Sequence, residues 1–170
     1  MPDALSLYAM VKPPLAIAHE IDCCRRLLDI ESRYGMARFH LTVLPLGNSL
    51  HIATAQLERL KQVMASVEVE PFRVALDTLE RNALIGKGNG GIRLLRQALK
   101  QALIAAGLPV AAYDARPHVS IAYDAAPERK LSVPTIAWTA EDFLLIRSGH
   151  GHHEVLGQWP LKSRQGKLPF

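Results

Sequence analysis

Two short stretches of the sequence, HLTV beginning at His40 and HVSI beginning at His118, repeat one pattern of histidine, apolar residue, hydroxyl residue and apolar residue. Side chains alternate across a β-strand, so His40 and Thr42 share one face, and His118 and Ser120 do the same. The apolar residues between them then face a core. The repeat therefore predicts a fold that contains two half-buried strands of the same kind.

The rest of the chain reads as strands and helices around these stretches. Alternating apolar and polar residues predict a strand over residues 4–12. Apolar residues at helical spacing predict a helix over residues 16–33, with Gly35 as its stop signal. The other predicted elements are the strand FHLTVLPLG, a helix with Ser49 as candidate N-cap, a strand at residues 71–79, a helix at residues 92–106, three extended segments, RPHVSIAYD, IAWTAEDFLLIRS and HHEVLGQWPL, and a loose tail, LKSRQGKLPF.

The order of these elements predicts a mixed fold of two related halves. A strong helix precedes a histidine-containing strand twice, once near residue 40 and once near residue 118. At 170 residues the chain is long enough to bury a proper core. We expect residues 1–170 to form a single domain made of two similar lobes.

Composition excludes several classes of protein. Hydrophobic residues make up 49% and charged residues 21%, as in ordinary globular proteins, so neither disorder nor a fibrous fold is indicated. No apolar run approaches the roughly 18 residues needed to cross a bilayer. Cys23 and Cys24 are adjacent and the N-terminus lacks the pattern of a secretion signal, so we expect a cytoplasmic protein. The net charge of +4 favours anionic partners such as nucleotides or RNA.

One histidine-containing strand is weak evidence for a site, because many antiparallel strands have one solvated face. Two copies are different, since on the order of one chain in a hundred with this histidine content would contain both by chance. If the strands meet at a cleft, one neutral imidazole can accept a proton and one protonated imidazole can donate one, each contributing about 10²- to 10⁴-fold. The hydroxyls can donate hydrogen bonds to a phosphate between them. The pattern suits hydrolysis of a phosphodiester.

These residues resemble a known family. HLTV at 40–43 and HVSI at 118–121 are similar to the two His-x-Thr/Ser-x motifs of the 2H phosphoesterase superfamily. Their surroundings, FHLTVLPLG and RPHVSIAYD, resemble its RNA 2',3'-cyclic phosphodiesterases, historically called 2'-5' RNA ligases. The strand LYAMVKPP, the helix that ends at Gly107 and the closing FLLIRSGHGHHEVLGQWPL extend the resemblance over nearly the whole chain.

The resemblance implies an α+β fold with two antiparallel sheets related by a pseudo-twofold, helices outside and a central cleft. It implies a metal-independent reaction, without a cofactor, that opens a terminal 2',3'-cyclic phosphate of RNA or a nucleotide to a 2'-phosphate. His40 would be the proton donor and His118 the proton acceptor, and Thr42 and Ser120 would hold the phosphate. We expect a monomer with no obligate protein partner.

The chain departs from the family pattern at two positions. Many members carry an arginine where Tyr123 stands, and an aromatic residue where Pro45 stands. The contacts that these residues make to the phosphate and the base are therefore expected to be missing or relocated.

Three glycines, Gly86, Gly88 and Gly91, spell the GxGxxG of a dinucleotide-binding turn before a predicted helix. No acidic residue closes a second strand about 20 residues further on, because that region is still helical. Lys87 does not have the spacing of a phosphate-binding loop either. We interpret this segment as a flexible turn into the helix.

Three histidines, His150, His152 and His153, lie close together in SGHGHHEV. Histidine-rich tracts can bind metals, but only Glu154 is available to complete a ligand shell. We therefore interpret the segment as a solvated hairpin tip.

The basic residues have two interpretations. Arg25 and Arg26 are most simply the solvated side of the first helix. Lys12, Lys87 and Arg116 either reach a phosphate near the cleft or lie on the surface.

Three alternatives to the main function remain open. The same site could join RNA ends by a 2'-5' linkage, or act on a small nucleotide such as a cyclic phosphate of the ADP-ribose type. The scaffold could also be a non-catalytic RNA-binding module.

Overall fold

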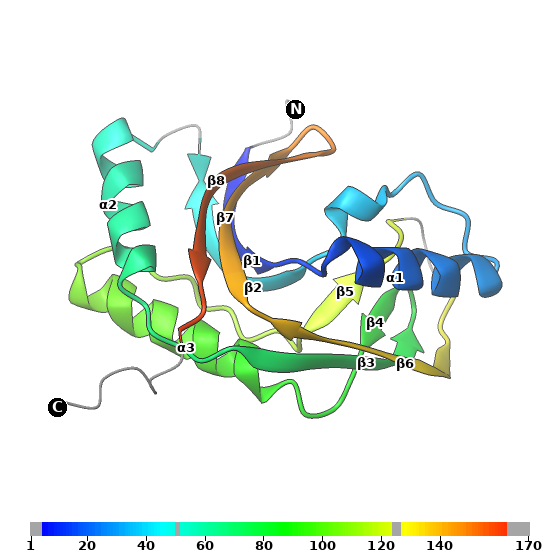
Figure 1. The fold of residues 1–170 in the computed structure, drawn as a ribbon. Helices are drawn as coiled ribbons and strands as arrows, with labels where there is room; N and C mark the ends of the chain where they lie inside the picture. Colours follow the sequence, from blue (N-terminus) through cyan, green and yellow to red (C-terminus); the bar gives the residue numbers. More distant parts are fainter. Residues whose placement is uncertain (1–4, 50–51, 124–126, 163–170) are drawn as a thin grey trace, which may run out of the picture.

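The computed structural model describes residues 5–49, 52–123 and 127–162 (Figure 1). In these residues eight strands form one antiparallel sheet, in the order β6-β3-β4-β5-β2-β1-β7-β8. The elements in chain order are β1 (Ser6–Val11), α1 (Leu15–Leu27), the 3-10 helix η1 (Met36–Arg38), β2 (Leu41–Asn48), α2 (Thr54–Ala65), β3 (Phe72–Glu80), β4 (Ala83–Ile85), α3 (Gly90–Ala105), β5 (His118–Ser120), β6 (Lys130–Ala140), β7 (Asp142–Gly149) and β8 (His152–Pro160).

The sheet consists of two halves, β2-β1-β7-β8 and β5-β4-β3-β6, whose innermost strands carry the two motifs. The halves join where Leu41 of β2 pairs with Val119 of β5. In Figure 1, α2 and α3 lie beside the half that contains β8, and α1 lies beside the half that contains β3. The predicted α+β fold is confirmed, and the two expected sheets are the halves of one continuous sheet.

The predicted division of each motif strand into two faces is confirmed. Phe39, Leu41 and Val43 are at most 1% exposed, and Val119 and Ile121 are completely buried. The histidines and hydroxyl residues between them are only partly buried. Burial of apolar side chains is the main favourable term in folding, so these residues fix the side of the sheet on which the polar ones emerge.

Two buried arginines connect the helices α1 and α3 to the segments that carry the two motifs. Arg25 of α1 donates a hydrogen bond from Nη1 to the main-chain oxygen of Ile121, at 3.1 Å. Arg96 of α3 donates from Nε to the main-chain oxygen of Val43, at 2.8 Å. The prediction that Arg25 is solvated is therefore wrong, because α1 turns this side chain under the end of β5; Arg26, its neighbour, is exposed as predicted.

The first helix is shorter than its sequence predicts. It ends at Leu27, and Gly35 lies well beyond it. The chain reverses at Asp29, whose φ of 52° lies in the left-handed region that Asp tolerates better than most residues. Of the residues beyond the helix, Leu28, Ile30 and Tyr34 pack against the core as part of an irregular segment.

Two other boundaries differ from the prediction. Ser49 does not cap a helix; its backbone N–H donates to the Leu5 oxygen at 2.8 Å, and α2 begins only at Thr54. The segment IAWTAEDFLLIRS is not one strand but the end of β6 and most of β7, in different halves of the sheet, with Glu141 between them. The predicted loose tail falls mostly outside the described residues.

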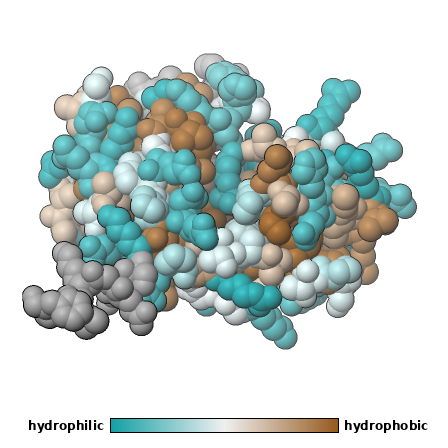
Figure 2. Space-filling model, in the orientation of Figure 1, coloured by the Kyte–Doolittle hydropathy of each residue, from teal (hydrophilic) through white to brown (hydrophobic). Residues whose placement is uncertain are grey.

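The surface in this view is mixed. Figure 2 shows hydrophilic residues over much of this face, with hydrophobic residues in separate patches between them. Among the described helices, none has the length and apolar character that would let it cross a membrane.

Candidate active site

The two motifs lie side by side where the halves of the sheet meet. Leu41 pairs with Val119 in an antiparallel arrangement. Continuing this register by one residue in each direction places each histidine opposite the hydroxyl residue of the other motif. The four polar side chains therefore share one face of the sheet, as predicted.

Extended from the Leu41–Val119 pair, the register sets His40 opposite Ser120 and Thr42 opposite His118. Opposite residues have Cβ atoms about 5 Å apart, and diagonal neighbours such as the two histidines are about 7–8 Å apart. The space between two imidazoles at that separation suits a tetrahedral phosphate. The structure thus brings together all four residues that the sequence singled out.

Both imidazoles are oriented by the same hydrogen bond. Nδ1 of His40 lies 2.6 Å from the main-chain oxygen of Arg38, and Nδ1 of His118 lies 2.8 Å from that of Arg116. A carbonyl oxygen can only accept, so Nδ1 carries the proton in each ring and donates it. When the ring is neutral, Nε2 is then the nitrogen that can accept a proton. In both motifs the residue that orients the histidine is thus the arginine two positions before it, through its main-chain oxygen.

The environment of His40 favours its neutral form. Burial is the main cause that lowers its pKa, from 6.5 to about 4, and the charges of Lys12 and Arg38 and the nearby His118 add to this. The hydrogen bond to the Arg38 oxygen acts in the opposite direction but is outweighed. Without a bound anion, His40 is therefore neutral at pH 7.

A third histidine, His153, lies against His40, and sequence reasoning missed it. The two ring centroids are 5.0 Å apart and the rings meet edge to face at 74°. Burial first, then the charge of Lys12, lowers the pKa of His153 to about 3. The prediction of a solvated hairpin tip holds for His150 and His152, which are exposed, but is wrong for His153. Neighbouring residues of a strand face opposite sides, so His152 and His153 cannot both be solvated in the same way, but the sequence alone does not say which of them faces inward.

Lys12 lies next to this pair of rings, directly after β1. Its Nζ donates a hydrogen bond to the main-chain oxygen of Ala37 at 2.6 Å. Burial, and then the charge of Arg38, lowers the pKa of Lys12. Of the two roles left open for this lysine, the effect of its charge on His40 favours the one near the phosphate.

Arg38 occupies the region where the family pattern led us to expect a relocated contact. Its guanidinium carbon lies 4.9 Å from the Tyr34 ring centroid and 4.7 Å from that of Tyr123. Its Nη2 donates to the Tyr123 hydroxyl at 2.6 Å, and the Tyr34 hydroxyl donates to the Arg38 oxygen at 2.9 Å. An arginine therefore stands beside Tyr123, although it comes from a different segment. A cavity of about 610 Å³ adjoins this group.

The glycines of the GxGxxG segment have structural explanations. A Cβ on Gly86 would lie 1.9 Å from the Ala75 oxygen, and one on Gly91 would lie 2.2 Å from Cγ of Phe72. Gly88 has a φ of +79°, which favours glycine. The segment leads into α3, as predicted, but Gly86 and Gly91 pack closely on β3, which does not fit the flexible turn that the sequence suggested. No group of three or more His, Cys, Asp or Glu side chains suited to a metal ion occurs in the described part of the chain.

The fold is shared with solved structures. LigT of E. coli in complex with 3'-AMP superposes with a TM-score of 0.74 at 17% identity, over 94% of this chain and 99% of that one. TT0787 of Thermus thermophilus gives a TM-score of 0.67 at 19% identity, over 94% of this chain and 100% of that one. At these identities the likeness concerns the fold alone.

The family itself follows from the sequence. No curated protein matches the chain. The profile of the 2'-5' RNA ligase superfamily, however, matches residues 13–151, a span that contains both motifs and all described strands except β1 and β8. The chain therefore belongs to the 2'-5' RNA ligase superfamily, the 2H phosphoesterases.

Proposed function

We propose that this protein is a metal-independent RNA 2',3'-cyclic phosphodiesterase, which opens a terminal 2',3'-cyclic phosphate to a 2'-phosphate. Membership of the superfamily supports an activity of the phosphoesterase type. The observation that carries the more specific proposal is the matched pair of imidazoles. Each imidazole donates a hydrogen bond from Nδ1 to a main-chain oxygen. In the register of the two strands the histidines are diagonal neighbours, and each has a hydroxyl residue opposite it.

In the proposed reaction His118 accepts a proton from water at Nε2 as the water oxygen attacks phosphorus. His40 donates a proton from Nε2 to the 3'-oxygen as the bond between that oxygen and phosphorus breaks. Thr42 and Ser120 donate hydrogen bonds to the non-bridging oxygens, where negative charge increases in the transition state. The products are a 2'-phosphate and a 3'-hydroxyl, and the two histidines have exchanged protonation states.

His40 must gain a proton before it can act as the acid. Its pKa of about 4 belongs to the site without an anion, where Lys12 and Arg38 contribute positive charge. A bound phosphodiester brings negative charge next to the ring, and an opposite charge at this distance raises the pKa of an imidazole. Substrate binding and protonation of His40 are therefore coupled in this proposal.

A nucleotide is the class of ligand that the comparisons support. LigT of E. coli was solved with 3'-AMP and with phosphate, and this chain shares its fold. A ribose with phosphate at its 3'-position resembles one side of the ring that the proposed reaction opens. This likeness favours a nucleoside phosphate over other phosphodiesters.

The deciding experiment is hydrolysis of cytidine 2',3'-cyclic phosphate, and of an RNA oligonucleotide with a 2',3'-cyclic end, in excess chelator. We expect a 2'-phosphate product, and a loss of about 10³-fold or more in kcat for His40→Ala and for His118→Ala. His150→Ala, which changes an exposed histidine of the hairpin, serves as the matched control and should keep full activity.

Four results would contradict the proposal. Retained activity in both histidine variants excludes the acid-base pair, and a 3'-phosphate product excludes the choice of leaving oxygen. RNA binding without turnover would instead favour the non-catalytic alternative. Joining of RNA ends in preference to hydrolysis would favour the ligase alternative.

A further inference from the structure

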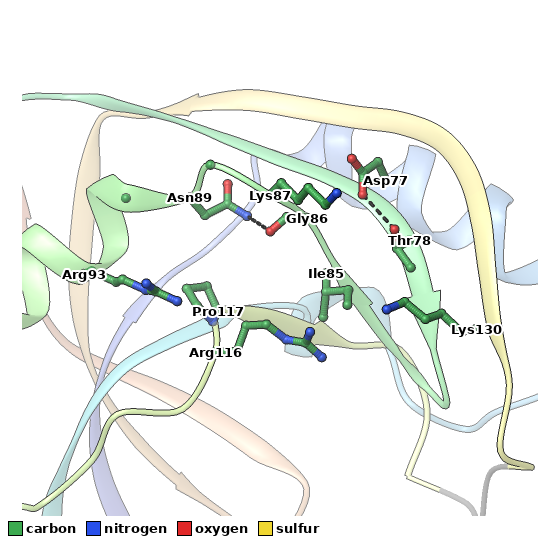
Figure 3. Close-up of a pocket in the computed structure, with 12 residues that line it drawn as sticks. Asp77, Thr78, Ile85, Gly86, Lys87, Asn89, Arg93, Arg116, Pro117 and Lys130 are labelled. Carbon is green, nitrogen blue, oxygen red and sulfur yellow. Dashed lines mark hydrogen bonds between the residues drawn. The ribbon is translucent and has the colours of Figure 1, made fainter.

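Figure 3 shows a second cavity, whose lining includes Arg116 and Pro117, the two residues directly before His118. Its volume is about 430 Å³, and its walls come from β3, β4, the turn before α3, the start of α3, the segment before β5 and the start of β6. Lys87, Arg93, Arg116 and Lys130 all line it. Segments that are distant in the sequence therefore bring four basic side chains to one cavity.

Strand pairing shows that this cavity opens on the face that carries His118. Ile85 pairs with His118 across β4 and β5, and Thr78 pairs with Ile85 across β3 and β4. Both Ile85 and Thr78 line the cavity, and paired residues of antiparallel strands point to the same face. Neighbouring strands lie about 4.8 Å apart, so the cavity extends from roughly 5 to 10 Å beyond β5.

Two of the basic residues have a carboxylate partner and two do not. Arg116 donates from Nη2 to Glu80 at 2.9 Å, and Nζ of Lys130 lies 4.0 Å from the same carboxylate oxygen. In Figure 3 these two side chains point toward one another. Lys87 and Arg93 form no ion pair or side-chain hydrogen bond within the described residues. They are therefore the side chains with free charge for a ligand.

The acidic groups near the cavity offset only part of this charge. Asp77 also lines it and accepts a hydrogen bond from the Thr78 hydroxyl at 2.8 Å. The carboxylates of Asp77 and Glu80 therefore face four basic side chains, and positive charge remains in excess. A partly enclosed cavity with excess positive charge attracts an anion more strongly than an open surface does.

We propose that this cavity binds a second phosphate group of the substrate, joined to the same nucleotide as the cyclic phosphate. Lys and Arg are the side chains that recognise phosphate, by charge and by paired N–H donors. In an RNA end this group is the 5'-phosphodiester of the terminal nucleotide, and in a small cyclic nucleotide it is a 5'-phosphate or pyrophosphate. The inference rests on the proposed function, because it takes the site between His40 and His118 as the place of the cyclic phosphate.

The test compares kcat/KM for cytidine 2',3'-cyclic phosphate, for the same compound with a 5'-phosphate, and for a dinucleotide with a 2',3'-cyclic end. We expect kcat/KM to rise about tenfold when the 5'-phosphate or phosphodiester is added. The double variant Lys87→Gln/Arg93→Gln should remove this rise and leave the activity on cytidine 2',3'-cyclic phosphate unchanged. The control, Arg59→Gln/Lys61→Gln, removes the same charges from α2 and should keep the rise. A larger rise for the dinucleotide than for the 5'-phosphate would identify RNA as the source of the second phosphate.

Two outcomes would contradict the phosphate site in the cavity but not the proposed reaction. One is an equal kcat/KM for all substrates in the wild-type protein, and the other is a rise in kcat/KM that survives in the double variant. Absence of any hydrolysis would overturn the proposed function, and binding then tests the cavity separately. Fluorescence anisotropy with a labelled hexanucleotide should show that the slope of log K against log salt concentration becomes shallower by about 0.7 in the double variant, since the contact to one phosphate is lost. An unchanged slope of log K against log salt concentration would contradict the phosphate site in the cavity.

Discussion

Arg96 of α3 donates a hydrogen bond to the main-chain oxygen of Val43, three residues after His40, and so connects this helix to the first motif strand, β2. Arg25 makes the equivalent bond to Ile121, three residues after His118. Each guanidinium also lies on an aromatic ring, Tyr113 for Arg96 and Phe39 for Arg25. The two motif strands share few backbone pairs, so these arginines help to hold their register.

Truncation of Arg96 tests this connection. The side chain is 3% exposed, so Arg96→Ala leaves a cavity and removes the donor of the Val43 oxygen. We expect the free energy of unfolding, measured in urea, to fall by about 3 kcal/mol. Gln101→Ala, at an exposed position of the same helix, should change it by less than about 0.5 kcal/mol. Equal effects of the two substitutions would contradict a structural role for Arg96.

Stability should decrease in mild acid because of His40. Its pKa is lowered from 6.5 to about 4 in the folded protein, so the unfolded chain binds a proton first as the pH falls. The stabilisation is complete above pH 6.5 and is lost progressively down to about pH 4, by up to about 3 kcal/mol. Urea unfolding at pH 7.5 and pH 4.5 measures this loss.

The matched variant for this pH effect is His40→Gln, which cannot take up the proton and should lose less stability between the two pH values. His153 adds a change in the same direction, since its pKa is also lowered. His152→Gln, at an exposed position, should behave like the wild-type protein. A His40→Gln variant with the full pH dependence would show that other groups cause it.

A substrate with sulfur in place of the 3'-oxygen distinguishes the acid from the base. A thiolate leaves without protonation, so the missing acid no longer limits the reaction. We expect His40→Ala to regain most of its lost kcat, about 10²-fold, on this 3'-thio cyclic phosphate. His118→Ala should remain slow on both substrates. Rescue of His118→Ala in place of His40→Ala would show that the two roles are reversed. This outcome matters because His40, the proposed acid, is neutral at pH 7 in the free protein.

Gly86→Ala tests whether the glycine-rich turn is shaped by packing. The added Cβ would lie 1.9 Å from a backbone oxygen, which cannot move without displacing β3. We expect a loss of about 3 kcal/mol in the free energy of unfolding. Gly90→Ala meets nothing within 4 Å and begins α3, so it should be neutral or slightly stabilising. Similar stability of the two variants would contradict the packing explanation.

Alternation along FHLTVLPLG and RPHVSIAYD was sufficient to predict which side chains face the core and which four polar ones share a face. It depends only on strand geometry, which is local. The helix over residues 92–106 was also predicted nearly to its ends, since its apolar stripe, closed by Gly107, is a strong local signal. The end of α1 was not, because the helix stops at Leu27 and the chain turns at Asp29, well before Gly35, which the prediction took as the stop residue.

Local patterns in the sequence were enough to identify the motifs, their faces and the family. The folded chain was needed to establish that Leu41 and Val119 pair, that His153 and Lys12 lie against His40, and that Arg25 is buried. These contacts join residues far apart along the chain, and short-range periodicity carries no information about them. Which charges surround an imidazole, and therefore its pKa, depends on how the two halves of the sheet meet.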